Sequence, residues 1–126
     1  EGWKSALTEK ERGRKPMKDA RGRPLAYIAS AYSGDIQRNT KASRIYSRFA
    51  VEQGYAPLNP ILNLVGVLSD ETGRDTALEI DLVLLRKADQ LFVFGEPTAG
   101  MKLEIAEAEK CHIRTRYFTK QLEEIT

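Results

Sequence analysis

Two acidic residues stand where a helix normally carries apolar side chains. In a helix expected near residues 74–87, Asp81 falls at the centre of the apolar arc. That arc is made of Ala77, Leu78, Leu84, Leu85 and Ala88. Burying an unpaired carboxylate costs on the order of several kcal/mol, so we expect this acid either to be paired with another group or to have a catalytic role. Two interpretations are open: a structural acid bonded to Arg74 or to loop amides, or a general acid with a raised pKa beside a cleft.

Glu104 is the second unusual acid, in a helix expected from Met101 to Cys111. At about 100° per residue it projects about 60° from Met101 and flanks the inward face. It also lies near the helix N-terminus, where free amides and the helix dipole favour an anion. We therefore expect an ionised carboxylate, as a nucleophile requires. The alternative is an ordinary glutamate that stabilises the first turn of its helix.

Two loops rich in small and hydroxyl residues accompany these acids. The loop from Gly95 to Met101 places Thr98 and Gly100 before a helix, where amides and the Thr98 hydroxyl could hold a phosphate or a sugar hydroxyl. Thr and Gly are also ordinary capping residues, so the capping interpretation stays open. Ser30-Ala-Tyr-Ser-Gly34 forms a similar loop after an earlier apolar segment.

Strands and helices alternate along the part of the chain that must position these residues. Apolar segments predict strands at 25–30, 55–57, 90–95 and 113–118. Helical periodicity predicts helices from 35 to 54, 61 to 68, 74 to 87 and 101 to 111, with a further helix over the last residues. This alternation predicts an α/β protein, a flavodoxin- or Rossmann-like three-layer sandwich with a four- to five-stranded parallel sheet. The functional loops then lie at the carboxyl ends of the strands.

Length and composition narrow the class of protein. A chain of 126 residues with 41% hydrophobic and 30% charged residues is typical of one globular domain. No apolar run approaches the roughly 20 residues that span a bilayer, so we expect a cytoplasmic protein with no membrane partner. The single cysteine excludes an internal disulfide framework, and no residue spacing indicates a metal or a cofactor.

The charges are unevenly distributed. Residues 1–24 carry eight basic and four acidic side chains, and the other 102 carry 12 basic and 14 acidic ones. We interpret residues 1–24 as a basic N-terminal arm and residues 25–126 as the folded domain. The arm is either a solvated tail or a weak contact for nucleic acid, phosphate groups or a partner subunit. Because the folded part has no net positive charge, a nucleic-acid partner is not expected.

Three segments together resemble the nucleoside 2-deoxyribosyltransferase superfamily, which includes the deoxynucleoside monophosphate N-glycosidases. These are Tyr-Ile-Ala-Ser-Ala-Tyr-Ser-Gly at 27–34, Glu-Ile-Asp-Leu with a later Ala-Asp at 79–89, and Gly-Met-Lys-Leu-Glu-Ile at 100–105. The similarity covers roughly residues 25–118. Each motif is weak, but their order and spacing are more specific.

The resemblance implies a reaction and assigns residues to it. Glu104 corresponds to the nucleophile that attacks the anomeric carbon of a nucleoside. Asp81 corresponds to the acid that protonates the departing base, as in retaining glycosidases. Tyr27 would hydrogen-bond and orient Glu104, and Tyr32 would stack on the base. Thr98 takes the place of a phosphate-contacting serine.

The remaining substrate contacts also follow from the resemblance. Besides Tyr32 and Thr98, we expect substrate contacts from Ser30, Ser33, Gly34, Arg38, Gly100 and Met101. Of these, only Arg38 is a cation near the first loop. Relatives share sites across subunits, which implies a homo-oligomer. The function expected is N-glycosidic bond cleavage or transfer on a nucleoside or nucleotide. The alternatives are a non-catalytic nucleotide-binding module and a purely structural domain.

Overall fold

A computed structural model describes residues 22–68 and 73–126 of the chain. Most of the basic arm expected at residues 1–24 lies outside these residues. At its end, Arg23 donates hydrogen bonds to the carbonyl oxygens of Val51 and Tyr55, at 2.8 and 3.0 Å. Within the described residues, no helix is both long enough and apolar enough to cross a bilayer.

The described residues form one five-stranded sheet in the order β2-β1-β3-β4-β5. Its strands are β1 (Leu25–Ala29), β2 (Ala56–Leu58), β3 (Gln90–Phe94), β4 (Arg114–Phe118) and β5 (Glu124–Ile125). The first four are parallel, and β5 pairs antiparallel with β4. This order reverses between β1 and β3, which is the switch point of a flavodoxin-like fold. A ligand site is therefore expected where these two strands end.

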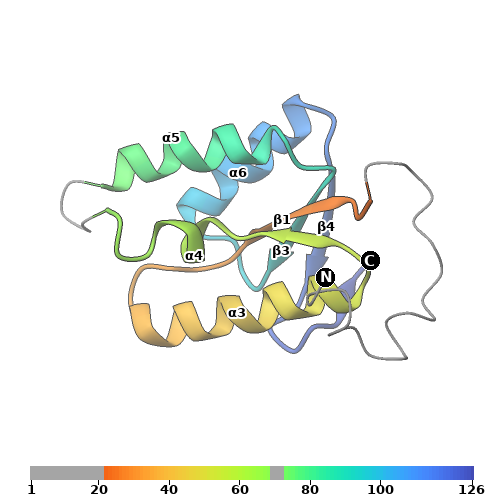
Figure 1. Cartoon of the computed structure of the whole chain (residues 1–126), viewed down its shortest axis with the longest axis horizontal. Coiled ribbons are helices and arrows are strands. Elements are labelled where there is room, and N and C mark those ends of the chain that lie inside the picture. Colours follow the sequence, from red (N-terminus) through yellow and green to blue (C-terminus); the bar gives the residue numbers. More distant parts are fainter. Residues whose placement is uncertain (1–21, 69–72) are drawn as a thin grey trace, which may run out of the picture.

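Helices cover both faces of the sheet, as the alternating pattern predicted. They are α3 (Ile36–Glu52), α4 (Pro60–Leu64), α5 (Arg74–Leu85) and α6 (Ala99–Lys110). In Figure 1, α5 and α6 lie above the sheet and α3 lies below it. The predicted three-layer α/β sandwich is confirmed.

The two hydrophobic cores follow from the alternation of side chains along the buried strands. Tyr27 and Leu91 point to the face covered by α5 and α6, where they pack with Leu85 and Met101. The neighbouring residues on the same strands point to the α3 face and pack with aromatic rings. This second core contains Ala26, Ile28, Tyr46, Ala50, Phe92, Phe94 and Phe118. Both central strands are therefore apolar on both faces, which is typical of a parallel sheet.

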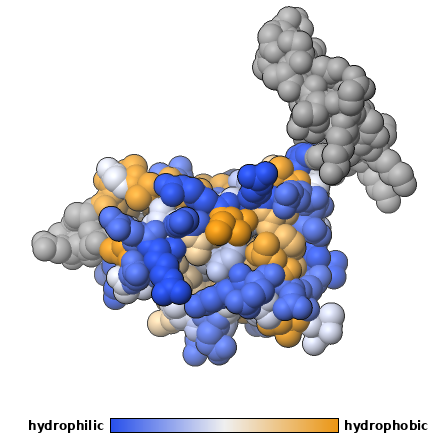
Figure 2. Space-filling view, turned by 90° about the horizontal axis from the view of Figure 1, so that it is seen from below, coloured by the Kyte–Doolittle hydropathy of each residue, from blue (hydrophilic) through white to orange (hydrophobic). Residues whose placement is uncertain are grey.

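The α3 helix has the ends that the sequence indicates. The side chain of Asp35 caps it by accepting a hydrogen bond from the amide of Arg38 at 3.2 Å. Beyond its end, Gly54 adopts a φ of +94°, which favours glycine. Hydrophilic side chains predominate on the face seen from below in Figure 2, and the hydrophobic ones form separate patches.

The last residues do not form the predicted helix. They turn back and add β5 to the sheet edge, with Glu124 opposite Phe118. The Thr119 hydroxyl accepts hydrogen bonds from the amides of Gln121 and Glu123, both at 3.2 Å, and thereby closes the turn. Arg116 then forms a two-pronged ion pair with Glu124 at 2.9 and 2.8 Å. Pairing with a neighbouring strand thus outweighs helix propensity in this short segment.

Candidate active site

A cavity of about 700 Å³ opens at the switch point between β1 and β3. Its walls come from the loop after β1, from α4 and the residues that follow it, from α5 as far as Asp81, and from the amino-terminal half of α6. Residues expected at the site that line it are Ser30, Tyr32, Ser33, Gly34, Asp81, Thr98, Gly100, Met101 and Glu104. The fold therefore brings both unusual acids into one cavity.

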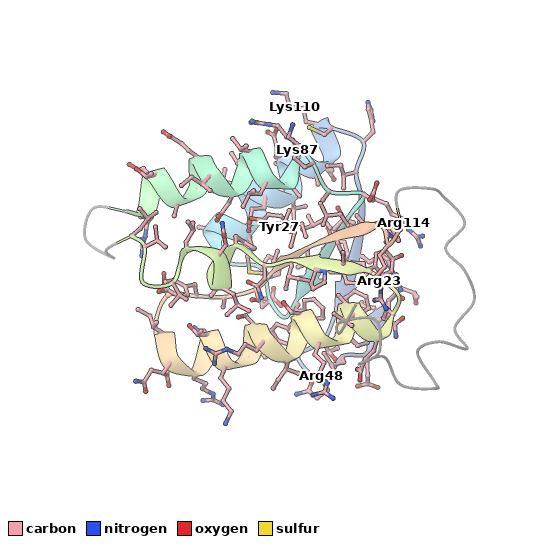
Figure 3. All side chains as sticks on the ribbon, in the orientation of Figure 1. Arg23, Tyr27, Arg48, Lys87, Lys110 and Arg114 are labelled. Atoms are coloured by element: carbon pink, nitrogen blue, oxygen red, sulfur yellow. The ribbon has the colours of Figure 1, made fainter. Side chains whose placement is uncertain are left out.

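Glu104 lies at the inner wall of this cavity and is only 6% exposed. The hydroxyl of Tyr27 donates a hydrogen bond to its Oε2 atom, as the resemblance implied. Tyr27 is fully buried behind Glu104, and Figure 3 places it in the middle of the molecule. A tyrosine sealed in the core holds the carboxylate in one orientation and leaves its other oxygen, Oε1, without this bond.

Burial alters the expected charge of Glu104. Its pKa is raised to about 7: desolvation by burial is the main cause, the Tyr27 hydrogen bond opposes the rise, and the negative charge of Asp81 adds to it. With this pKa the Glu104 carboxyl is only partly ionised near neutral pH, whereas the sequence analysis expected an ionised carboxylate. Glu104 is the sixth residue of α6, too deep in the helix for the free amides at its start to offset the loss of water.

Asp81 reaches the same cavity from α5. Its Oδ1 atom is buried and has no hydrogen-bond partner among the described residues. No ion pair joins Asp81 to Arg74 among the described residues, and the Arg74 guanidinium donates to the hydroxyl of Ser33 at 3.2 Å. Burial raises the pKa of Asp81 to about 6. A proton-carrying aspartate is therefore available at slightly acidic pH.

The loop after β1 presents polar groups to the cavity. Asn39 holds it in place, since its side-chain amide donates to the carbonyl oxygens of Tyr32 and Ser33 at 3.0 and 3.1 Å. The hydroxyl of Ser30 is buried and, in the described part of the chain, has no partner. Like the Asp81 oxygen, it is a buried polar atom in the cavity wall that a bound ligand could satisfy with a hydrogen bond.

The loop after β3 is shaped by a glycine and a helix cap. Gly95 adopts a φ of +79°, and an added Cβ would lie 3.2 Å from the Lys120 side chain, so a larger residue would be strained. The Thr98 hydroxyl accepts a hydrogen bond from the amide of Met101 at 3.3 Å. The capping interpretation of Thr98 is thus confirmed, and the residue still borders the cavity.

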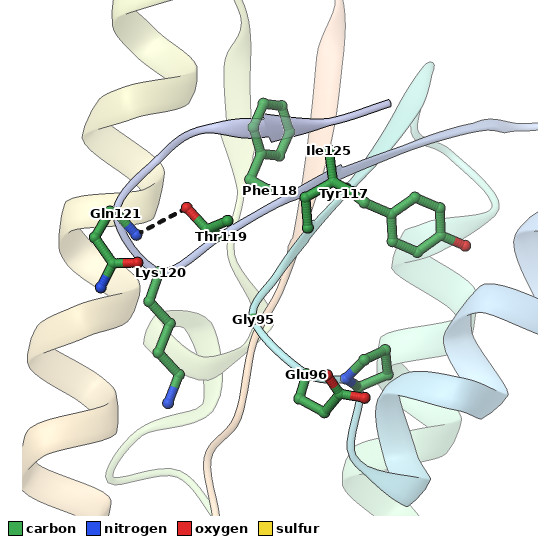
Figure 4. Close-up of a pocket in the computed structure, with 9 residues that line it drawn as sticks. Gly95, Glu96, Tyr117, Phe118, Thr119, Lys120, Gln121 and Ile125 are labelled. Atoms are coloured by element: carbon green, nitrogen blue, oxygen red, sulfur yellow. Dashed lines mark hydrogen bonds between the residues drawn. The ribbon is translucent and has the colours of Figure 1, made fainter.

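A second cavity, of about 400 Å³, lies at the carboxyl ends of β3 and β4. Figure 4 shows Tyr117, Glu96 and Lys120 around it. Neither unusual acid lines this cavity. The larger cavity at the switch point is therefore the candidate active site.

Arg38, expected to contact the substrate, is not among the residues that line the cavity. Its side chain is exposed on α3. Among the described residues, the cation that does line the cavity is Arg74, at the start of α5. The sequence contained a signal for this, because Arg74 lies seven residues before Asp81 and so shares its helix face.

The wall formed by α4 also lay outside the sequence-based prediction. Pro60, Ile61 and Leu64 contribute apolar surface to the cavity. Asn59 fixes this short helix by donating to the carbonyl oxygen of Ser43 at 3.1 Å and accepting from the amide of Leu62 at 3.3 Å. In the described ranges, no group of three or more His, Cys, Asp or Glu side chains is placed to hold a metal ion.

Solved structures with the same fold include two 2-deoxyribosyltransferases. The 2-deoxyribosyltransferase of Bacillus psychrosaccharolyticus superposes with a TM-score of 0.61 at 18% identity, covering 81% of this chain and 76% of that one. The 2-deoxyribosyltransferase of Leishmania mexicana gives 0.55 at 16% identity, covering 76% of this chain and 64% of that one. At these identities the comparison establishes the fold, which is 2-deoxyribosyltransferase-like.

A third structure with this fold is the CMP N-glycosidase BcmB of Clostridium botulinum, with a TM-score of 0.53 and 18% identity. It covers 75% of this chain and 71% of that one. Among curated proteins, no sequence matches this chain significantly. One family model does match, over residues 24–118, and it is described as a domain of unknown function, DUF7768. That match spans the whole scaffold of the cavity, from β1 to β4, and the chain belongs to this family.

Proposed function

We propose that this protein cleaves or transfers the N-glycosidic bond of a nucleoside or nucleotide. The observation that carries the proposal is the meeting of Glu104 and Asp81 in one cavity, with Tyr27 bonded to Glu104. Two carboxyl groups on one cavity are what a retaining displacement at a sugar carbon requires. The fold shared with 2-deoxyribosyltransferases and a CMP N-glycosidase supports the same chemistry.

The proposed first step forms a glycosyl-enzyme ester. The Oε1 atom of Glu104 attacks the anomeric carbon while the bond from that carbon to the base nitrogen breaks. The electron pair of the broken bond stays on the base, and protonated Asp81 gives its proton to the base. Tyr27 holds Oε2 and keeps Oε1 directed at the sugar. Asp81 leaves this step as a carboxylate.

The second step releases the sugar from Glu104. Asp81 takes a proton from the acceptor, which is water in a hydrolase or a second base in a transferase. The acceptor then attacks the anomeric carbon, and the carbon–oxygen bond of the ester breaks with its electrons returning to Glu104. Both carboxyl groups regain their starting protonation states, so the cycle needs no cofactor.

The test is release of free base from a panel of deoxynucleosides, ribonucleosides and their 5′-monophosphates, followed by chromatography. We expect release from at least one compound, and we expect Glu104→Ala to abolish it. Glu109→Ala is the matched control, because Glu109 lies on the same helix and is exposed. Absence of release from every compound would reject the proposed reaction.

We further propose that the protein works as a homo-oligomer, as the resemblance implied. Val65 and Leu103 border the cavity yet are 45% and 52% exposed. Large apolar side chains at the rim of a polar site are typical of surfaces covered by another subunit. Light scattering coupled to size exclusion should give a dimer or larger assembly. Leu103→Lys should shift it toward the monomer, whereas a monomeric unmodified protein would reject the idea.

A further inference from the structure

Arg74 differs from the other cations in its position. Of the described residues that line the cavity, it is the only lysine or arginine. Its guanidinium donates to the Ser33 hydroxyl at 3.2 Å, which ties the start of α5 to the loop after β1. The side chain is therefore directed across the mouth of the cavity.

Among the described residues, no carboxylate forms an ion pair with Arg74. Three arginines of the described chain form ion pairs, namely Arg48, Arg86 and Arg116. Within the described residues Arg74 forms no ion pair, and its hydrogen bond to Ser33 uses one of its five N–H donors. A guanidinium fork with free donors matches the oxygens of a phosphate.

The distance along α5 fits a nucleotide. Arg74 precedes Asp81 by seven residues, which is a rise of about 10 Å on the same helix face. A 5′-phosphate is separated from the glycosidic bond by the sugar ring and one further carbon. With the glycosidic bond beside Asp81 and Glu104, the phosphate falls on the Arg74 side of the cavity.

We propose that Arg74, held by Ser33, is a specificity-determining residue that binds an anionic group on the sugar, so that the substrate is a nucleotide and not a neutral nucleoside. This inference rests on the proposed function, since it places the sugar by the two acids. The proposal assigns to Arg74 the cationic substrate contact that the sequence analysis expected from Arg38.

Binding measurements test the inference without turnover. Calorimetry with the Glu104→Gln protein compares a deoxynucleoside, its 5′-monophosphate and inorganic phosphate, using the four common bases. We expect the monophosphate of at least one base to bind about 10- to 100-fold more tightly than its nucleoside. Adding Arg74→Ala should remove this difference while leaving nucleoside affinity within about twofold.

Matched variants separate Arg74 from a general effect of charge. Arg44→Ala removes an exposed arginine of α3 outside the cavity and should leave both affinities unchanged. Ser33→Ala frees the guanidinium and should weaken monophosphate binding severalfold. If Arg38→Ala lowers monophosphate affinity and Arg74→Ala does not, the inference is overturned.

The outcomes also separate this inference from the proposed function. Arg74-dependent binding of a monophosphate without any base release supports the anion site and rejects the reaction. Base release that is equal for nucleoside and monophosphate, and unaffected by Arg74→Ala, supports the reaction and rejects the anion site. Equal or absent binding of nucleoside and monophosphate also rejects the anion site.

Discussion

The hydroxyl of Tyr27 in β1 donates a hydrogen bond to Glu104 in α6, 77 positions later in the chain. Both side chains are buried, so the bond is shielded from water. It lowers the pKa of Glu104 against the larger effect of burial, which raises it. The core of the sheet thereby sets both the direction and the charge of the proposed nucleophile.

The first prediction concerns the pH dependence of activity. The reaction needs Glu104 ionised and Asp81 protonated, and burial raises their pKa values to about 7 and about 6. Because the two acids interact, kcat/KM should be bell-shaped with a maximum between about pH 6 and 7. Asp81→Asn should remove the alkaline limb. A profile that keeps rising above pH 8 would contradict the assignment of the acid.

The second prediction concerns Tyr27→Phe, which removes only the donor to Glu104. Without this bond the pKa of Glu104 rises further, so less of the protein has Glu104 ionised while Asp81 is protonated. The maximum of kcat/KM should fall and its alkaline limb should move to higher pH. The loss of one buried hydrogen bond should also cost about 1–2 kcal/mol of stability. Tyr117→Phe is the control, because Tyr117 is exposed on β4. An unchanged pH profile would show that Tyr27 has only a packing role.

The third prediction concerns stability. Burial raises the pKa of Glu104 from 4.5 to about 7, so the folded protein holds a proton that the unfolded chain releases. This stabilisation is fully present below pH 4.5 and is lost as the pH rises through about 7. Glu104→Gln removes the charged form, so at pH 8 it should raise the free energy of unfolding by about 1–3 kcal/mol.

Chemical denaturation at pH 4.5 and pH 8 measures this effect. At pH 4.5 the variant and the unmodified protein should have nearly equal stability, because both side chains are then neutral. Glu109→Gln, on the exposed side of α6, should change neither value. A Glu104→Gln protein that is less stable at pH 8 would contradict the raised pKa.

The fourth prediction concerns the α4 wall. Asn59→Ala removes the bonds to Ser43 and to the α4 amide of Leu62, so it should cost about 1–3 kcal/mol of stability. A looser wall should raise KM severalfold and leave kcat nearly unchanged, since neither acid is touched. Asn63→Ala, which is exposed on the same helix, is the control. A loss confined to kcat would contradict this positioning role.

Several features followed from the sequence because they depend on local physics. The apolar runs of β1 and β3, the Asp35 cap and the turn at Gly54 are each read from adjacent residues. The two acids were recognised because charged side chains interrupt an apolar helix face. Because strands and helices alternate along the chain, the positions of the two acids then placed both at one edge of a parallel sheet.

Only the tertiary structure decided the rest, because it depends on contacts between distant residues. Pairing with β4 made the last residues a strand, and burial against β1 changed the charge of Glu104. The bond from Arg74 to Ser33 joins segments 41 positions apart, a contact that the helix pattern around Asp81 does not indicate. Periodicity indicates which face of a helix is buried, but desolvation and long-range hydrogen bonds exist only once the elements have packed.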